Sequence, residues 1–221
     1  MSEFSIIITA GGIGKRMGTT IPKQFIEIGG KPILIRTLEI FHSFDPNAQI
    51  IVTLPKEWQN YWTDLLKAYN CSISHTIVDG GDERYHSIKN ALKHCNGSYI
   101  AVHDGVRPFV SYDTLKRCFD AVKIQHQIVP VIPIKESIRK KTDQQTIAVN
   151  RTEYVTVQTP QCFLKATLEK AYEHTYHEGV TDDATLVEHA GFPIYLVDGN
   201  EENIKVTSKI DLLLAEKLCG I

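Results

Sequence analysis

Short apolar stretches alternate with stretches of helical periodicity along most of the chain, and this alternation limits the possible folds more than any other feature. The apolar stretches are rich in β-branched residues and predict strands at 4–9, 50–54, 73–78, 99–103, 128–134 and 193–197. Between them, apolar residues recur at helical spacing in 32–44, 57–69, 85–94 and 112–126. Runs such as QIIVTL are apolar on both faces, which is typical of a parallel sheet covered by helices. We therefore expect an α/β fold of three layers with a mostly parallel, twisted sheet.

The length of the chain and one irregular stretch indicate how it is organised. With 221 residues, the chain is long enough for one domain with a substantial core, so we expect a single domain over 1–221. Near the C-terminus, TSKIDLLLAEKL predicts a last helix with Ser208 as N-cap and Asp211 three residues later. Residues 135–158 break the alternation, because they are polar and then alternate through two short β-like pieces. We expect them to project as a β-arm that can reach a second subunit.

Composition excludes several classes of protein. The formal net charge of −2 argues against a general electrostatic grip on nucleic acid or on an acidic membrane. No apolar run reaches the ~18 residues expected for a membrane span, and MSEFSIII lacks the basic region of a signal peptide. The 5 cysteines are scattered without a CxxC pair, so they indicate neither a zinc site nor a disulfide framework. A cytoplasmic protein with reduced thiols and only local anion binding is the interpretation we favour.

The first expected strand runs directly into a cationic, glycine-rich loop, IIITAGGIGKRMG. Glycines such as Gly12 and Gly14 let the backbone approach a triphosphate and turn its N–H groups towards it. Arg16 and Lys23, the latter in IPKQF, add two cations to the same region. Paired cations beside a phosphate chain suit catalysis at phosphorus, because charge builds on the oxygens in the transition state. The alternative is a glycine-rich turn with solvated surface cations.

Other nucleotide-binding motifs are alternative explanations of the same loop. A P-loop requires GxxxxGK[ST], but Lys15 is followed by Arg16. The GxGxxG motif of an NAD(P)-dependent oxidoreductase fails narrowly, because Gly18 comes one position late. Such an enzyme would also need an acidic residue after the second strand, where Leu54 and Pro55 stand. A non-catalytic nucleotide-binding module stays open, although it would need no paired cations.

A second cluster, AVHDGVRPF, places Asp104 at the C-terminal end of an expected strand. Ligands of open α/β sheets bind at that edge, where a carboxylate can hold Mg²⁺ against substrate phosphates. Arg107 can bind a further phosphate as a bidentate clamp. The alternative is an ion pair between Asp104 and Arg107 within the turn. We expect His103 to be a packed or hydrogen-bonded histidine of the strand end and not a base.

A third cluster, DGGDERYHSI, follows the third expected strand. Gly81 turns the chain, and Asp82 is a candidate N-cap of the next helix. In the functional alternative, the backbone of the turn and the hydroxyl of Ser87 recognise the edge of a base.

Three downstream stretches carry further polar residues. In GVTDDATLVEHAG, Thr181 or Asp182 is a candidate N-cap. Lys205 lies in NIKVT, which we expect to be an otherwise apolar short strand, so an anionic ligand would serve as its partner. His174 and His177, with the adjacent Glu178, suggest a metal, but they more readily form a solvated helix face.

Six motifs in this order resemble the 2-C-methyl-D-erythritol 4-phosphate cytidylyltransferase family of the non-mevalonate isoprenoid pathway. The motifs are AGGIGKRMG with PKQF, VDGGDER, VHDGVRPF, QTPQCF, TDDATLVE and NIKVT, and together they span nearly the whole chain. The resemblance implies a Rossmann-like nucleotidyltransferase fold whose β-arm forms a homodimer. It also implies that CTP and methylerythritol 4-phosphate react to give a CDP-alcohol and pyrophosphate, with Mg²⁺ or another divalent cation as cofactor.

The resemblance further implies a role for each matching residue. Catalytic residues are expected at Arg16, Lys23 and Lys205, the first two at the pentacoordinate α-phosphorus, and Asp104 matches the Mg²⁺ ligand. Nucleotide-binding residues are expected at Ala10, Gly11, Gly12, Gly14, Gly81, Asp82 and Ser87. Residues that bind the alcohol phosphate are expected at Asp104, Arg107, Ser137, Arg151, Thr159, Thr181 and Lys205. Of these, Arg151 matches a residue at the base of the arm that reaches into the site of the partner subunit.

Residue chemistry agrees with this reaction. The nucleophile would be a phosphate monoester, whose second pKa is about 6, so it is already largely ionised at neutral pH and needs no general base. A sister group, the ribitol 5-phosphate cytidylyltransferases, is the alternative, because AGGIGKRMG and HDGVRPF lean slightly towards it. TDDATLVE and NRTEYVTVQTPQCF match the methylerythritol enzymes better. Two departures from the family pattern are Val106, which is larger than the usual alanine, and Ser137, which stands where threonine is common.

Overall fold

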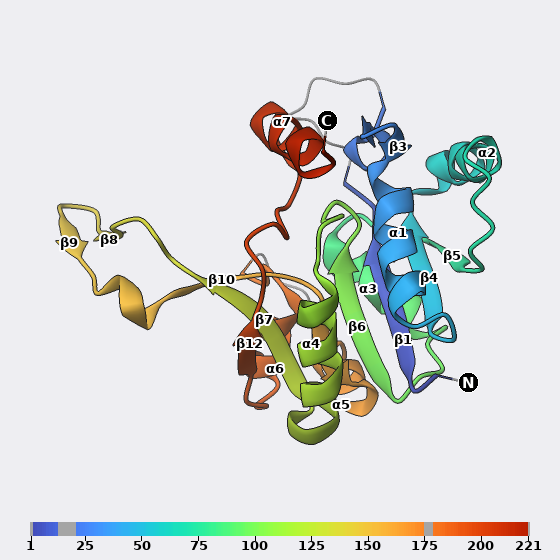
Figure 1. The fold of residues 1–221 in the computed structure, drawn as a ribbon. Coiled ribbons are helices and arrows are strands. Elements are labelled where there is room, and N and C mark those ends of the chain that lie inside the picture. Colours follow the sequence, from blue (N-terminus) through green and yellow to red (C-terminus); the bar gives the residue numbers. More distant parts are fainter. Residues whose placement is uncertain (1, 13–20, 175–178, 221) are drawn as a thin grey trace.

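A computed structural model describes residues 2–12, 21–174 and 179–220 (Figure 1). Its centre is an 8-stranded sheet in the order β10-β7-β11-β6-β1-β4-β5, with β12 also paired to β7. The strands are β1 (Phe4–Thr9), β4 (Gln49–Leu54), β5 (Thr76–Asp79), β6 (Tyr99–Asp104), β7 (Gln127–Pro133), β10 (Val155–Val157), β11 (Gln161–Leu164) and β12 (Tyr195–Asp198). Strands β6, β1, β4 and β5 run parallel, and β12 is parallel to β7, whereas β10 and β11 are antiparallel to their neighbours.

Helices cover both faces of the sheet, which confirms the three-layer α/β prediction (Figure 1). They are α1 (Ile33–Phe44), α2 (Gln59–Ala68), α3 (Arg84–Leu92), α4 (Tyr112–Gln125), α5 (Lys165–Ala171), α6 (Asp183–His189) and α7 (Lys209–Leu218). Strand β1 shows why both faces are apolar. Ile6 and Ile8 pack in one core cluster with residues of α1, α2 and α4, whereas Ile7 packs in the other with residues of α3, α5 and α6. Each of these isoleucines is 0% exposed, and burying such a side chain stabilises the fold by roughly 1.5–3 kcal/mol.

Most expected elements appear within a few residues of their predicted ends. The third strand begins at Thr76, three residues later than the prediction, and a short 3-10 helix (Lys56–Trp58) precedes α2. The hydrophobic periodicity of the sequence did not predict β11, α5 or α6. These elements have 4, 7 and 7 residues, which is too short for a clear hydrophobic period.

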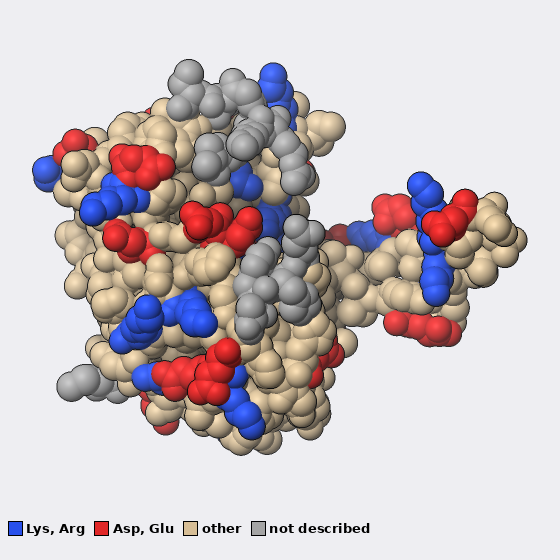
Figure 2. Space-filling model, turned by 180° about the vertical axis from the view of Figure 1, so that it is seen from behind, with Lys and Arg blue, Asp and Glu red and all other residues tan. Residues whose placement is uncertain are grey.

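The arm contains two short strands, the first of them in its polar part, where the sequence predicted no β-piece. Strands β8 (Arg139–Lys141) and β9 (Thr146–Ala148) form a separate antiparallel pair, which extends from the body of the molecule in Figures 1 and 2. A 3-10 helix (Arg151–Glu153) leads back from them. The last residues of the stretch 135–158 differ from the prediction, because β10 pairs with β7 in the central sheet.

The C-terminal helix holds two parts of the chain together. Ser208 and Asp211 form a capping box at the start of α7, as predicted. Glu216 of this helix accepts a hydrogen bond from the Gly29 N–H at 2.9 Å, in the hairpin of β2 (Glu27–Ile28) and β3 (Lys31–Pro32). That hairpin follows the 3-10 helix η2 (Lys23–Phe25).

Within the described part of the chain, no helix is both long and apolar enough to cross a membrane.

His75 makes the stability of this fold depend on pH. The indole N–H of the fully buried Trp62 donates to His75 Nε2 at 2.9 Å, so this nitrogen must be unprotonated, and His75 Nδ1 lies 2.8 Å from the Ile73 carbonyl oxygen. Burial lowers the pKa of His75 below its usual value of 6.5. The unfolded chain therefore binds a proton before the folded protein does, and stability decreases as the pH falls below about 6.5.

We expect urea unfolding at pH 7, 6 and 5 to show this loss, with a contribution from His75 of less than about tenfold in the unfolding equilibrium constant per pH unit. A His75→Gln variant should lose less stability over this range than the native protein. Parallel pH profiles for the two proteins would contradict the assignment.

Candidate active site

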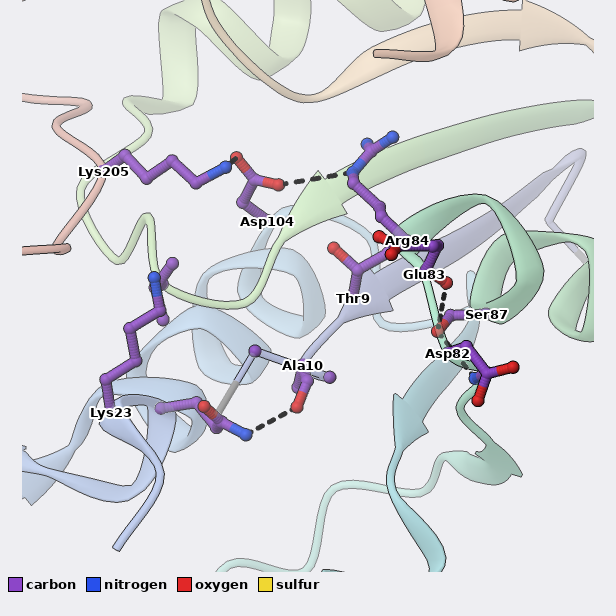
Figure 3. Close-up of a pocket in the computed structure, with 14 residues that line it drawn as sticks. Thr9, Ala10, Lys23, Asp82, Glu83, Arg84, Ser87, Asp104 and Lys205 are labelled. Atoms are coloured by element: carbon purple, nitrogen blue, oxygen red, sulfur yellow. Dashed lines mark hydrogen bonds and ion pairs between the residues drawn. The ribbon is translucent and has the colours of Figure 1, made fainter. Parts of the chain in front are cut away.

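The loops that follow the parallel strands meet at the C-terminal edge of the sheet. Thr9 at the end of β1 lies opposite Asp104 at the end of β6, as the strand register shows. Around this edge is a cavity of about 570 Å³, shown in Figure 3. The predicted site residues that line it are Ala10, Gly11, Gly12, Lys23, Gly81, Asp82, Ser87, Asp104 and Lys205. Gly14 and Arg16 lie outside the described residues.

One wall of this cavity is built from backbone and small side chains. The Gly81 N–H donates to Ser87 Oγ at 3.0 Å, and a Cβ at position 81 would lie 2.3 Å from His86 Cβ, so only glycine fits there. Across the cavity, the Ala10 carbonyl accepts from the buried Gln24 amide at 2.6 Å. These bonds hold the two loops in place on either side of the cavity.

Asp82 does not cap α3. The N-cap of this helix is Glu83, without a side-chain capping bond, so the capping interpretation of Asp82 is wrong. Asp82 is instead exposed and lines the cavity.

Asp104 is surrounded by positive charge. Its Oδ2 lies 3.0 Å from Lys205 Nζ and 3.1 Å from Arg107 Nε, and its Oδ1 lies 3.7 Å from Arg84 Nε; Figure 3 shows Lys205 and Arg84 reaching it from opposite sides. Burial by itself raises the pKa of Asp104, but the charges of Arg84, Lys205 and Arg107 outweigh burial and hold this pKa well below its usual value. The carboxylate is therefore ionised at neutral pH. The predicted turn pair between Asp104 and Arg107 is present, and Asp104 also stands at the ligand-binding edge.

Lys205 reaches Asp104 from a segment that differs from the prediction. Residues 203–207 form no strand in the described structure, so the expected short strand is wrong. The segment is held by the Val206 N–H, which donates to the Val106 carbonyl at 2.9 Å.

The site fits a divalent cation only if phosphate oxygens supply most of its ligands. Among the described residues, no group of three or more His, Cys, Asp or Glu side chains is placed to hold a metal ion. From the described part of the chain, Asp104 Oδ1 has only the long contact to Arg84, which leaves it a position for a cation. A single protein carboxylate with several phosphate oxygens is a usual set of ligands for Mg²⁺.

A second cavity of about 340 Å³ adjoins the first, since Arg84, Asp104 and Lys205 line both. Three further predicted residues line it, namely Arg107, Thr159 and Thr181. Asp182, which follows Thr181 and also lines this cavity, is the N-cap of α6, because its carboxylate accepts a hydrogen bond from the Thr185 N–H at 2.9 Å.

The two predicted residues of the arm lie elsewhere. Ser137 and Arg151 are exposed, and in the described structure they line neither cavity. The Arg151 guanidinium donates to the Lys135 carbonyl within the arm. Of the candidate metal ligands on the downstream helix face, His177 and Glu178 are outside the described residues.

Arg84 lines both cavities but was not among the predicted site residues. Its guanidinium lies 2.6 Å from a carboxylate oxygen of Asp183, whose side chain is 0% exposed. Burial lowers the pKa of Arg84, but the charges of Asp183 and Asp104 raise it above its usual value, so Arg84 stays charged. A signal was present, because a cation in the first turn opposes the helix dipole and calls for a carboxylate partner.

His103 is the packed histidine that we predicted. It is 0% exposed, its Nδ1 lies 3.0 Å from Thr159 Oγ1, and its Nε2 lies 3.0 Å from the Arg107 carbonyl oxygen. Burial lowers the pKa of His103 to about 4. The ring is therefore neutral at pH 7 and orders the loop after β6.

Comparison with known proteins identifies what the chain is similar to. Residues 4–220 match the family described as 2-C-methyl-D-erythritol 4-phosphate cytidylyltransferase. Enzymes of that name from Bacteroides fragilis and Phocaeicola vulgatus are 48% and 46% identical to this chain, over 96% of its length and 97% and 98% of theirs. The crystal structure of the Thermus thermophilus enzyme of that name superposes with a TM-score of 0.82 at 30% identity and covers 100% of both chains.

Proposed function

Because this chain belongs to the 2-C-methyl-D-erythritol 4-phosphate cytidylyltransferase family, we propose that its two adjoining cavities hold the two substrates of that reaction. The protein transfers CMP from CTP to 2-C-methyl-D-erythritol 4-phosphate, releases pyrophosphate and forms the CDP-alcohol. The observation that carries the assignment of the cavities is their shared border. Arg84, Asp104 and Lys205 line both, so two anionic substrates would meet there.

The larger cavity is the proposed CTP site. Two loops of this cavity would hold the planar cytosine between them. One loop carries Ala10 and Gly11, and the other carries Gly81, Asp82 and Ser87. The triphosphate would lie beside Gly12, at the start of the glycine-rich loop, and the family resemblance assigns Gly14 to the same role.

The smaller cavity is the proposed site of the alcohol phosphate. Arg107, Thr159, Thr181 and Lys205 supply two cations and two hydroxyls around a space of about 340 Å³. Arginine binds a phosphate through a planar pair of N–H donors, and the Thr181 hydroxyl can donate to a further oxygen, whereas the Thr159 hydroxyl already donates to His103 Nδ1.

The proposed reaction takes place where the two substrates meet. A phosphate oxygen of methylerythritol 4-phosphate attacks the α-phosphorus of CTP, and a new P–O bond forms while the bond to the β-phosphate oxygen breaks and pyrophosphate leaves. The phosphate nucleophile is largely ionised at neutral pH, so no side chain has to accept a proton. Lys23, Arg16 and Lys205 would neutralise the charge that grows on the phosphorus oxygens. When bound at Asp104, Mg²⁺ would add further neutralisation of the phosphates.

The arm is proposed to complete the smaller cavity of a second subunit in a homodimer. Apolar surface that is grouped marks an interaction site, and the arm and its base expose Ile147, Tyr154, Val155 and Val157 at 48%, 46%, 41% and 40%. Ser137 and Arg151 would then contact the alcohol phosphate in the partner.

We further propose that 1–221 form one domain with this arm. The five free cysteines support a reducing, cytoplasmic location.

Arg151→Ala is expected to raise the KM for methylerythritol 4-phosphate by about tenfold or more and to change the KM for CTP little, because one charge-assisted contact is worth about 1.5–3 kcal/mol. Steady-state kinetics with each substrate varied in turn would measure this. Arg139→Ala, also on the arm but paired with Thr146, is the control. A KM for the alcohol phosphate that stays unchanged in a dimeric Arg151→Ala protein would contradict the cross-subunit site.

The reaction itself is tested by identifying its product. The purified protein with CTP, Mg²⁺ and methylerythritol 4-phosphate should form a compound with two coupled ³¹P signals of a diphosphate diester. Hydrolysis of CTP without such a product would contradict the assignment.

A further inference from the structure

Two buried amide side chains lie at the back of the smaller cavity. Asn203 is 0% exposed and Gln158 is 2% exposed. Gln158 contributes to the cavity wall, whereas Asn203 is not one of the residues that line it in the described structure. A buried amide is costly unless it is hydrogen-bonded, so the partners of these two groups indicate what they hold in place.

Asn203 connects two of the residues proposed to bind the alcohol phosphate. Its Nδ2 donates to the Thr159 carbonyl at 2.8 Å, and its own backbone carbonyl accepts from Arg107 Nη1 at 2.8 Å. The same Nδ2 lies 3.4 Å from Gln158 Oε1. The Asn203 side chain therefore anchors residue 203 to the backbone of Thr159, and the main-chain carbonyl held in this way orients the Arg107 guanidinium.

Gln158 holds the turn that carries Asn203. Its Nε2 donates to the Asn200 carbonyl at 2.8 Å, and its Oε1 lies 3.3 Å from the Asn200 N–H. A Cβ at Gly199 would lie 2.3 Å from Gln158 Oε1, so a side chain there would displace this amide from its hydrogen bonds. The amide and the turn are thus fitted to each other.

These bonds converge on the shared border of the two cavities. Arg107 and Lys205 both contact Asp104 Oδ2, at 3.1 and 3.0 Å. The Asp104 N–H donates to Thr159 Oγ1 at 3.1 Å, and Lys205 follows Asn203 by two residues. Among the described residues, the buried Oδ1 of Asn203 has no hydrogen-bond partner, so this amide is held through the Nδ2 donor that faces the Thr159 carbonyl.

We propose that Gln158 and Asn203 are positioning residues for the alcohol phosphate. They hold Arg107 and the backbone at Thr159 in the arrangement that binds it, without touching CTP. This inference rests on the proposed function of the smaller cavity.

The test is steady-state kinetics of Asn203→Ala and Gln158→Met with CTP, Mg²⁺ and methylerythritol 4-phosphate. Gln158→Met keeps the length of the side chain and removes its amide, so it serves if Asn203→Ala does not fold. We expect the KM for methylerythritol 4-phosphate to rise about tenfold and the KM for CTP to change less than about twofold, because only the binding of one substrate is weakened.

Gln127→Ala is the matched control. This amide is also buried, and its Nε2 donates to Thr167 Oγ1 at 3.2 Å, away from both cavities. The control should lower thermal stability without changing the ratio of the two KM values.

A double-mutant cycle separates positioning from simple support of the fold. If Asn203 acts through Arg107, then Asn203→Ala should raise the KM for the alcohol phosphate much less in an Arg107→Ala background. Fully additive effects, or equal rises in both KM values, would overturn the inference while the native enzyme remains active. A native protein that does not react with methylerythritol 4-phosphate would overturn the proposed function, and this inference with it.

Discussion

Lys23→Ala is expected to lower kcat by about 10²–10³-fold while CTP still binds. Lys23 lines the larger cavity on the opposite side from Ser87 and Asp82, in the short helix η2 that follows the glycine-rich loop (Figure 3). A cation aimed at developing charge in a site shielded from water stabilises the transition state more than the ground state, and removal of one such group typically has this effect.

The experiment is single-turnover chemistry together with equilibrium binding of CTP. Lys31→Ala is a suitable control, because Lys31 lies in the adjacent hairpin and pairs with Glu39 at 2.7 Å. We expect native rates for the control and a Kd for CTP within a few-fold of the native value for Lys23→Ala. Unchanged turnover of Lys23→Ala would contradict the catalytic assignment of this lysine.

Asp183→Ala is expected to destabilise the fold by about 3 kcal/mol, because it removes the buried partner of an ion pair whose other member, Arg84, is 28% exposed. Asp183 is 0% exposed, and its two oxygens accept from Arg84 at 2.6 Å and from the Tyr172 hydroxyl at 2.6 Å. The variant would leave both donors without this acceptor. For a chain of this size, the loss corresponds to a decrease in Tm of about 6–12 °C.

Asp120→Ala is the control for this measurement. Asp120 pairs with Lys116 at 2.7 Å, but both side chains are largely exposed, at 65% and 60%, and such pairs contribute at most about 1 kcal/mol. Urea unfolding of the three proteins would give the free energies directly. Equal losses for Asp183→Ala and Asp120→Ala would contradict the structural role of the Arg84–Asp183 pair.

The parts of the fold that could be predicted are those in which one local pattern decides the structure. Strand β1 has apolar residues on both faces because each face packs in its own core cluster, and α4 has a clear helical period over 14 residues. Helices α5 and α6 have only 7 residues each. Their positions depend on packing against distant parts of the chain, which no short window contains.

The same distinction applies to the site. Asp104 and Gly81 were found because a strand end and a glycine turn are recognisable in a short stretch of sequence. The importance of Arg84 and Asn203 depends on partners that are distant in sequence, since Arg84 pairs with Asp183, 99 residues away, and Asn203 bonds Thr159, 44 residues away. Lys205 was identified as a cation that needs an anionic partner, but its partner in this structure is Asp104 and its segment is not a strand.

The most direct test of the account is pyrophosphate release from CTP and Mg²⁺ in parallel reactions with methylerythritol 4-phosphate, with ribitol 5-phosphate and with no alcohol. We predict rapid release with methylerythritol 4-phosphate alone. Release with ribitol 5-phosphate alone, or at the same rate without any alcohol phosphate, would contradict the proposal that the smaller cavity binds methylerythritol 4-phosphate as the nucleophile.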